Sequence, residues 1–200
     1  MIDQRLSRQI QFIVEIDRLK SVLRRTTIMD GSRRENSAEH SWHLALMALV
    51  LSEHADDAVD ICHVIRMVLL HDIVEVDAGD TFCYDEEGVV SQAQREQQAA
   101  QRIFGLLADD QAGELRALWH EFEEGATAEA RFAVALDRLQ PLLCNMQSNG
   151  GSWTQYGISA DQVRTRMAPV ARGSSRLAEL TRTLLDEALA CGYLQEQVKG

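Results

Sequence analysis

Apolar residues recur at helical spacing along almost the whole chain, and this pattern limits the possible folds more than any other feature. Leu6, Ile10, Ile13 and Ile16 begin the first apolar stripe. The alternation of apolar and polar residues that a half-buried strand needs is nearly absent. The sequence therefore predicts an all-α fold, a helical array with mostly short connections, and not a βαβ fold.

Capping residues mark the start of several expected helices. Asn36 with Glu39, Ser91 with Gln94, and Ser159 with Gln162 have the spacing of a capping box, and Thr127 can cap a further helix. We expect roughly eight helices: residues 3–24, 36–54, 57–76, 91–108, 114–124 and 127–147, one that begins at 159 and is disturbed at Pro169, and 174–191. The segments 80–90 and 148–158 are expected to be loops.

The length of 200 residues fits one domain with a sizeable core. We expect a single domain over residues 1–200. Its core would span about residues 34–147, and the N-terminal helix 3–24 and the C-terminal helices 159–191 would pack on that core.

The chain is acidic, with 31 acidic residues against 20 basic ones and a net charge of −11. Such a chain repels polyanions, so long nucleic acid is not expected as a partner. The basic residues are unevenly spread, however, and six of them gather near the N-terminus: Arg18, Lys20, Arg24, Arg25, Arg33 and Arg34. This basic segment suits a small anion such as phosphate, although charge alone favours a solvated helix end.

The cysteines indicate the compartment. Cys62, Cys83, Cys144 and Cys191 are widely spaced, with no C-x-x-C pair, which argues against a disulfide framework or a structural zinc site. No apolar run approaches the length of a membrane-spanning helix. We therefore expect a cytoplasmic protein without a membrane partner.

Two polar residues, His71 and Asp72, interrupt the apolar run from Val68 to Val74. A buried carboxylate without a partner is costly, and a metal ion can be that partner. Imidazole and carboxylate together suit divalent Mn, Fe, Co, Ni or Zn. Taken alone, the dipeptide fits a hydrogen-bonded core pair better than a metal site.

His40 and Asp137 extend this pattern. His40 follows the expected capping residue Asn36, and Asp137 interrupts an apolar helix face. Three expected helices would then each present a ligand to one point. Four protein ligands leave room for water or phosphate oxygens on a six-coordinate ion.

Three segments carry a resemblance to a known family: residues 34–41 (RENSAEHS), 71–80 (HDIVEVDAGD) and 133–140 (AVALDRLQ). With them the chain resembles the metal-dependent phosphohydrolases of the HD superfamily. It is most similar to the 5′-nucleotidase group, which includes bacterial 5′-deoxynucleotidases and their eukaryotic relatives. The resemblance implies a single HD domain and a homodimer. It also implies one divalent ion (Mn, Co, Fe, Ni, Zn or Mg) on four ligands: His40, His71, Asp72 and Asp137.

The implied activity is release of phosphate from nucleoside 5′-monophosphates by attack of a metal-activated water. Glu75 and Asp80 are the expected catalytic acids; a helix places Glu75 on the same side as His71 and Asp72. The alternative for both acids is a solvated carboxylate.

Three arginines are candidates for gripping the phosphate: Arg25, which matches a phosphate-side arginine of the deoxynucleotidases, and Arg33 and Arg34. The chain differs from those enzymes at Thr26, where they have a tryptophan that influences the choice of sugar. The resemblance therefore does not extend to a preference for deoxyribose.

Two other functions stay open from the residues. The chain could be an HD hydrolase that acts on a nucleoside di- or triphosphate, a cyclic or alarmone nucleotide, or a non-nucleotide phosphate. It could also be an inactive HD module that binds a nucleotide or a partner. The presence of the four expected ligands together with Glu75 and Asp80 favours an enzyme.

Overall fold

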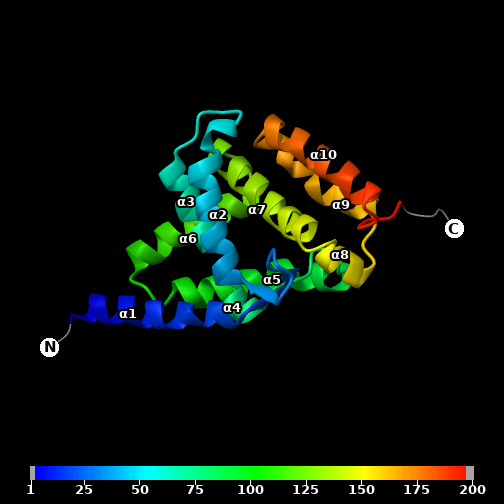
Figure 1. The fold of residues 1–200 in the computed structure, drawn as a ribbon. Helices are drawn as coiled ribbons and strands as arrows, with labels where there is room; N and C mark the ends of the chain where they lie inside the picture. The colour runs from blue at the N-terminus through cyan, green and yellow to red at the C-terminus, as the bar shows by residue number, and fades with distance from the viewer. Residues whose placement is uncertain (1–2, 197–200) are drawn as a thin grey trace.

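The computed structural model describes residues 3–196, apart from the side chains of residues 86, 87 and 89. Figure 1 shows that helices dominate, as predicted. The α-helices are α1 Gln4–Ile16, α2 Ser37–Leu51, α3 Ile61–Leu70, α4 Glu75–Ala78, α5 Glu86–Phe104, α6 Asp109–Glu124, α7 Ala128–Gln147, α8 Gly151–Tyr156, α9 Ala160–Met167 and α10 Ser175–Ala190. Short 3-10 helices follow α1, α2 and α9: η1 Asp17–Ser21, η2 Ser52–His54 and η3 Ala168–Arg172. None of the helices described is long and apolar enough to cross a membrane.

Helix α7 runs through the middle of the molecule (Figure 1). It packs against α2, α3 and α6 on one side and against η3 and α10 on the other. Fully buried apolar side chains fill these contacts, among them Leu44, Val68, Phe132, Leu136 and Leu139. This cluster is the main core. It holds α7 against α2 and α3, the helices that position His40 and the His71–Asp72 pair.

A second apolar cluster joins α1, η1, α5 and α6, with Phe12, Leu19, Ile103 and Phe104 buried in it. Leu70, the last residue of α3, packs against both clusters. The His71–Asp72 pair therefore begins where the two cores meet, which holds its backbone from both sides.

The predicted capping boxes are confirmed at two helix starts. The Asn36 side chain accepts a hydrogen bond from the Glu39 backbone N–H at 3.0 Å, and the Glu39 carboxylate accepts one from the Asn36 backbone N–H at 3.3 Å. Ser159 and Gln162 form the same motif at α9. Thr127 caps α7 through the Ala130 N–H, also as predicted.

The prediction for residues 3–36 was wrong in part. Helix α1 ends at Ile16 and not near residue 24, and an antiparallel hairpin follows, formed by β1 (Leu23–Thr27) and β2 (Arg34–Asn36). Leu23 pairs with Asn36, and Thr27 with Arg34. A strand this short gains most of its stability from its partner strand, so the helical spacing of the apolar residues does not reveal it.

Other boundaries also differ from the prediction. The expected helix 57–76 stops at Leu70, and α4 is a separate short helix. Helix α5 begins at Glu86, because Asp85 caps it through the Gly88 N–H, and not at Ser91. Helix α6 begins at Asp109 and not at 114. The segment 148–158, expected to be a loop, contains α8, so that α4 and α8 add to the eight helices expected.

Candidate metal centre

His40 lies in the first turn of α2, and a chain of hydrogen bonds fixes which of its ring nitrogens carries the proton. The Glu35 carboxylate accepts a hydrogen bond from Gln140 Nε2 at 2.7 Å. The amide oxygen of Gln140 therefore faces His40 and accepts from Nδ1 at 3.1 Å. Because Nδ1 donates, Nε2 keeps its lone pair. This nitrogen lies 2.9 Å from Asp137 Oδ1, which is also an acceptor.

His71 has the same arrangement with a backbone partner. Its Nδ1 donates to the Val68 carbonyl at 2.8 Å, which leaves the lone pair on Nε2. This Nε2 is buried and makes no hydrogen bond, although it lies 3.0 Å from Asp72 Oδ1 and 3.6 Å from Asp137 Oδ1. The second imidazole therefore also points its Nε2, the nitrogen available to a metal, at carboxylate oxygens.

The end of α3 at Leu70 sets the direction of the His–Asp pair. Residues 71–74 form a turn, where the sequence predicted a continuous helix. Asp72 points one oxygen to His71, and its other oxygen accepts from Arg24 Nη1 at 2.7 Å. Asp72 thus joins the imidazole cluster to the hairpin.

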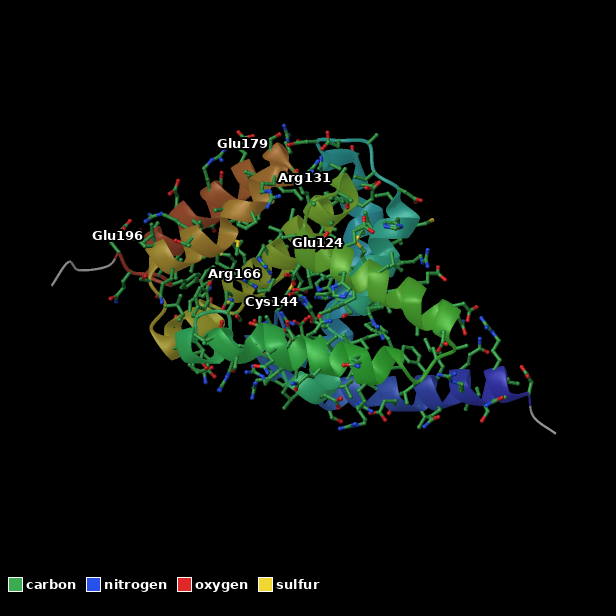
Figure 2. The ribbon with its side chains drawn as sticks, turned by 180° about the vertical axis from the view of Figure 1, so that it is seen from behind. Glu124, Arg131, Cys144, Arg166, Glu179 and Glu196 are labelled. Carbon is green, nitrogen blue, oxygen red and sulfur yellow. The ribbon has the colours of Figure 1, made fainter. Side chains whose placement is uncertain are left out.

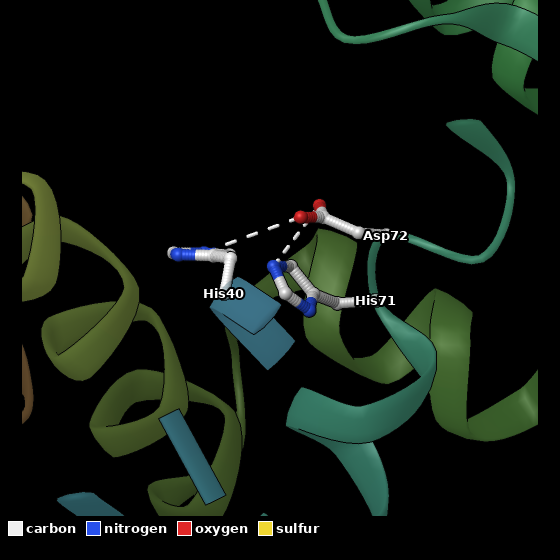
Figure 3. A group of neighbouring side chains, drawn as sticks. All are labelled: His40, His71 and Asp72. Atoms are coloured by element: carbon white, nitrogen blue, oxygen red, sulfur yellow. Dashed lines mark ion pairs between the residues drawn. The ribbon is translucent and has the colours of Figure 1, made fainter. Parts of the chain in front are cut away.

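Figure 3 shows His40, His71 and Asp72 converging from separate parts of the chain. One ligand atom from each residue lies within 4.8 Å of the other two, and all three residues are buried. Asp137, on α7, completes the group through its contacts with both imidazoles. The structure therefore brings the four predicted side chains together at one point.

This arrangement fits a divalent cation. Two imidazole Nε2 atoms and two carboxylates face one another, so a proton or a cation is needed between them. Burial alone would raise the pKa of Asp72, but a protonated His71 and Arg24 lower it to about 2, and against burial Asp72 and Asp137 raise the pKa of His71 well above its usual range. Without an ion, a proton on His71 therefore balances the carboxylates, and a divalent cation would take the place of that proton. Neutral imidazole nitrogens and ionised carboxylates are the donor set that divalent transition metals prefer.

Glu75 and Asp80 flank the cluster. Glu75, the first residue of α4, is buried and accepts a hydrogen bond from Ser37 Oγ at 2.5 Å. Its burial and the nearby Asp72 raise the pKa of Glu75 well above the usual range. Asp80 follows Gly79, whose positive φ of 73° favours glycine. Burial also raises the pKa of Asp80, against the opposing charge of Arg24.

The hairpin places Arg24, which was not among the predicted site residues, beside the cluster. The Arg24 side chain is 12% exposed, and its Nη1 lies 2.7 Å from Asp72 and 3.9 Å from Asp80. Arg25 points to the other face of β1, where it is exposed and donates to the Tyr156 hydroxyl at 3.2 Å. The alternation of side chains along a strand is the signal that separates these two neighbours.

The other two predicted arginines have different partners. Arg33 is exposed and forms a bidentate pair with Glu39 at 2.7 and 2.8 Å. Arg34 donates to the backbone carbonyls of Leu23 and Arg24. Neither side chain lines the cavity next to the cluster. Both brace the hairpin and the start of α2.

That cavity lies beside the cluster and shares Asp137 with it. Its lining residues are Arg24, Arg25, Thr26, Asp80, Thr81, Phe82, Cys83, Tyr84, Asp137, Arg138, Pro141, Leu142, Asn145, Ser152, Trp153, Arg166 and Met167. Phe82 lies 5.0 Å from the Tyr156 ring and 5.3 Å from the Tyr84 ring. The Arg25 guanidinium lies over Tyr156, 5.4 Å from the ring centroid. The cavity thus joins guanidinium groups at the cluster to an aromatic wall.

Comparisons with known proteins identify the family of this chain. The HD domain family profile matches residues 16–178. The chain is 32% identical over 135 residues to 5′-deoxynucleotidase HDDC2 of Homo sapiens, a match that covers 67% of this chain and 65% of the human protein. The HDDC2 protein of Bos taurus is also 32% identical, with 67% of this chain and 64% of the bovine protein covered. The chain therefore spans slightly less than two thirds of the length of these relatives.

Two solved structures are also similar to this chain. A predicted metal-dependent phosphohydrolase from Magnetospirillum magnetotacticum MS-1 is 53% identical, with a TM-score of 0.91 over 96% of this chain and 100% of that chain. A conserved hypothetical protein from Pyrococcus furiosus shares the fold, with a TM-score of 0.64 at 18% identity over 87% of this chain and 99% of that one. Since the profile covers most of the residues that form the helical core and the cluster, the chain belongs to the HD domain family.

Proposed function

We propose that this chain is a metal-dependent phosphomonoesterase that releases phosphate from nucleoside 5′-monophosphates. One observation carries the proposal: a buried cluster of imidazoles and carboxylates borders a cavity that contains both guanidinium groups and an aromatic wall. The guanidinium groups suit a phosphate, and the aromatic wall suits a base. The names of the human relative and of the Magnetospirillum protein support the same reaction class.

We propose that His40, His71, Asp72 and Asp137 hold one divalent ion, of the series Mn, Co, Fe, Ni, Zn or Mg. When bound, this ion would polarise a phosphoryl oxygen and lower the pKa of a water molecule. Glu35 and Gln140, which were not predicted to have a role, hold the His40 ring with Nε2 toward the cluster. Such indirect partners set the tautomer and orientation of a ligand.

Glu75 is the proposed proton donor to the leaving nucleoside oxygen. Its burial and the nearby Asp72 raise its pKa and so favour the protonated carboxyl group, and Ser37 donates a hydrogen bond to one of its oxygens. The other oxygen is then the one that carries the proton. Asp80 lines the cavity within 3.9 Å of Arg24, so its proposed role is to orient the Arg24 guanidinium and the substrate.

Arg24 is the proposed phosphate-binding residue. It lies at the cluster end of the cavity, and the carboxylates around it keep its guanidinium charged and in place. Arg25 lies at the aromatic end, over Tyr156, where it would contact the sugar or the base. Thr26 leaves more space in this cavity than a tryptophan would, so we propose no preference for deoxyribose.

The proposal extends to the organisation of the chain. We propose a single HD domain over residues 1–200, with residues 34–147 as its core. We also propose a homodimer, supported by four exposed apolar residues on α2: Trp42, Leu46, Leu49 and Val50. The four cysteines are free, which supports a cytoplasmic location. The net charge of −11 supports a small phosphorylated substrate, not long nucleic acid.

Phosphate release from a nucleotide panel tests the proposal. The purified chain, with Mn, Co, Mg or Zn added and its metal content measured, should release orthophosphate and a nucleoside from 5′-monophosphates. Release of pyrophosphate, or turnover of only di-, tri- or cyclic nucleotides, would assign it to another HD hydrolase class. No turnover of any nucleotide by metal-loaded protein would favour a binding module.

A further inference from the structure

Two further arginines line the cavity and have no part in the hydrolysis proposed above. Arg138 belongs to α7 and Arg166 to α9, and both line the cavity. Arg166 shares the lining of the cavity with Cys83 and Tyr84, and Figure 2 marks its place as seen from the back of the molecule. The two side chains therefore border the substrate space from helices, and not from the hairpin that carries Arg24.

The same two arginines also line a neighbouring groove. Cys83, Tyr84, Arg138 and Arg166 border both the cavity and this groove. The cluster-side residues Arg24, Asp80 and Asp137 border only the cavity. A ligand that reaches past the wall formed by Arg138 and Arg166 would therefore enter the groove, away from the phosphate that is hydrolysed.

Arg166 carries the uncompensated positive charge of the groove, since Arg138 is paired with Asp137. The acidic lining residue of the groove, Asp161, is paired with Arg164 at 2.9 Å. Among the described side chains, Arg166 makes no hydrogen bond and no ion pair. Arg138 donates through Nη1 to Asp137, but its buried Nε has no partner. Two guanidinium groups with free donors thus face the same space.

A bound oxyanion accounts for this arrangement. Like charges that share a partly buried space repel each other, and an anion between them relieves the repulsion. The planar donor fork of arginine matches a phosphate through two parallel hydrogen bonds. We propose that Arg138 and Arg166 form a second phosphate-binding subsite, so that the preferred substrate is a nucleoside 5′-monophosphate with a further phosphate on its ribose. This assignment of the substrate class rests on the proposed function.

Equilibrium binding tests the subsite without turnover. Adenosine 5′-monophosphate and adenosine 3′,5′-bisphosphate are titrated calorimetrically into the full chain in the presence of a chelator. Arg166→Gln is the test variant. Arg176→Gln is the control, since Arg176 is exposed on α10 and lines neither the cavity nor the groove.

Wild type should bind the bisphosphate at least about tenfold more tightly than the monophosphate, the gain expected for charge-assisted hydrogen bonds to a phosphate. Arg166→Gln should lose this preference while keeping its affinity for the monophosphate, and Arg176→Gln should keep both. Equal affinities in wild type, no measurable binding of the bisphosphate, or a preference that survives in Arg166→Gln would overturn the subsite. Failure of the proposed function appears separately, as absence of phosphate release by metal-loaded wild type.

Discussion

The metal centre and the part of the cavity lining that contains Arg25 and Arg166, here called the outer wall, satisfy their polar groups in different ways. In the centre, His40 is fully buried, and the proton of each imidazole is assigned by a neighbour: Gln140 for His40 and the Val68 carbonyl for His71. On the outer wall, the Arg25 and Arg166 side chains are more exposed, and Arg166 keeps its donors free among the described residues.

This difference separates chemistry from selection. A centre whose protons and rotamers are fixed by the surrounding helices is preorganised for one ion and one reaction. A wall with free donors and aromatic rings can adapt to the remote part of a substrate. Changes in the centre should therefore abolish turnover, and changes in the wall should alter affinity and substrate choice.

The largest effect is expected for Asp137→Ala. Asp137 contacts both imidazoles, so its loss removes a proposed ligand and the anchor of His40 together. Metal analysis should show a fall from one ion per chain to a small fraction, and phosphate release should fall to background. Asp186→Ala, at an exposed position on α10, is the control and should behave as wild type. A variant at Asp137 that kept its metal and its activity would remove the basis for the proposed site.

Glu75→Gln should retain the ion but lose the proton donor. We expect kcat to fall by about 100- to 10,000-fold, the usual contribution of a positioned general acid, with KM little changed. Because the pKa of Glu75 is raised, wild-type kcat should fall as the pH rises through that pKa, and the variant should lack this fall. Steady-state rates across pH, with metal content measured in parallel, check both points. Equal turnover by the two proteins would show that Glu75 is not catalytic.

Arg24→Gln and Arg25→Gln compare neighbours on opposite faces of one strand. Loss of Arg24 should lower kcat/KM for a nucleoside 5′-monophosphate by about 100- to 1,000-fold, as for other donors aimed at developing charge. Loss of the exposed Arg25 should change it by less than about threefold. Metal content of Arg24→Gln must be checked, because Arg24 contacts Asp72. A greater loss at Arg25 would reverse the assignment of the two arginines.

Tyr156→Leu should have a smaller effect than Arg24→Gln. The Tyr156 ring packs against Phe82 and lies under Arg25, two residues that line the cavity at the end proposed for the base. Removing one aromatic contact should raise KM by about two- to twelvefold. Ribose 5-phosphate has no base, so its hydrolysis should be unchanged. If KM rises equally for both substrates, Tyr156 does not contact the base.

The parts of the fold that depend on local chemistry could be predicted. The capping box of Asn36 and Glu39 and the Thr127 cap start α2 and α7, the helices that carry His40 and Asp137, and both were found from residue spacing alone. The end of α3 at Leu70 could not be predicted this way. The run around His71 continues the helical pattern, and the turn there depends on contacts with both apolar clusters.

In the site, too, features set by local sequence could be predicted and features set by distant contacts could not. The four side chains of the cluster could be identified because polar residues on apolar helix faces need partners. The sequence could not show that Arg24, and not Arg25, contacts Asp72. Successive side chains of a strand point in opposite directions, and the hairpin itself was not predicted. Glu35 and Gln140 were visible only as members of the matching segments, because their role depends on a contact between distant parts of the chain.

Anomalous diffraction at the metal edge, from crystals grown with Mn or Co, tests the central claim most directly. We expect a single strong peak within about 2.0–2.3 Å of His40 Nε2, His71 Nε2 and an oxygen each of Asp72 and Asp137. A peak elsewhere, or a loaded centre in which His40 or Asp137 is not a ligand, would contradict it.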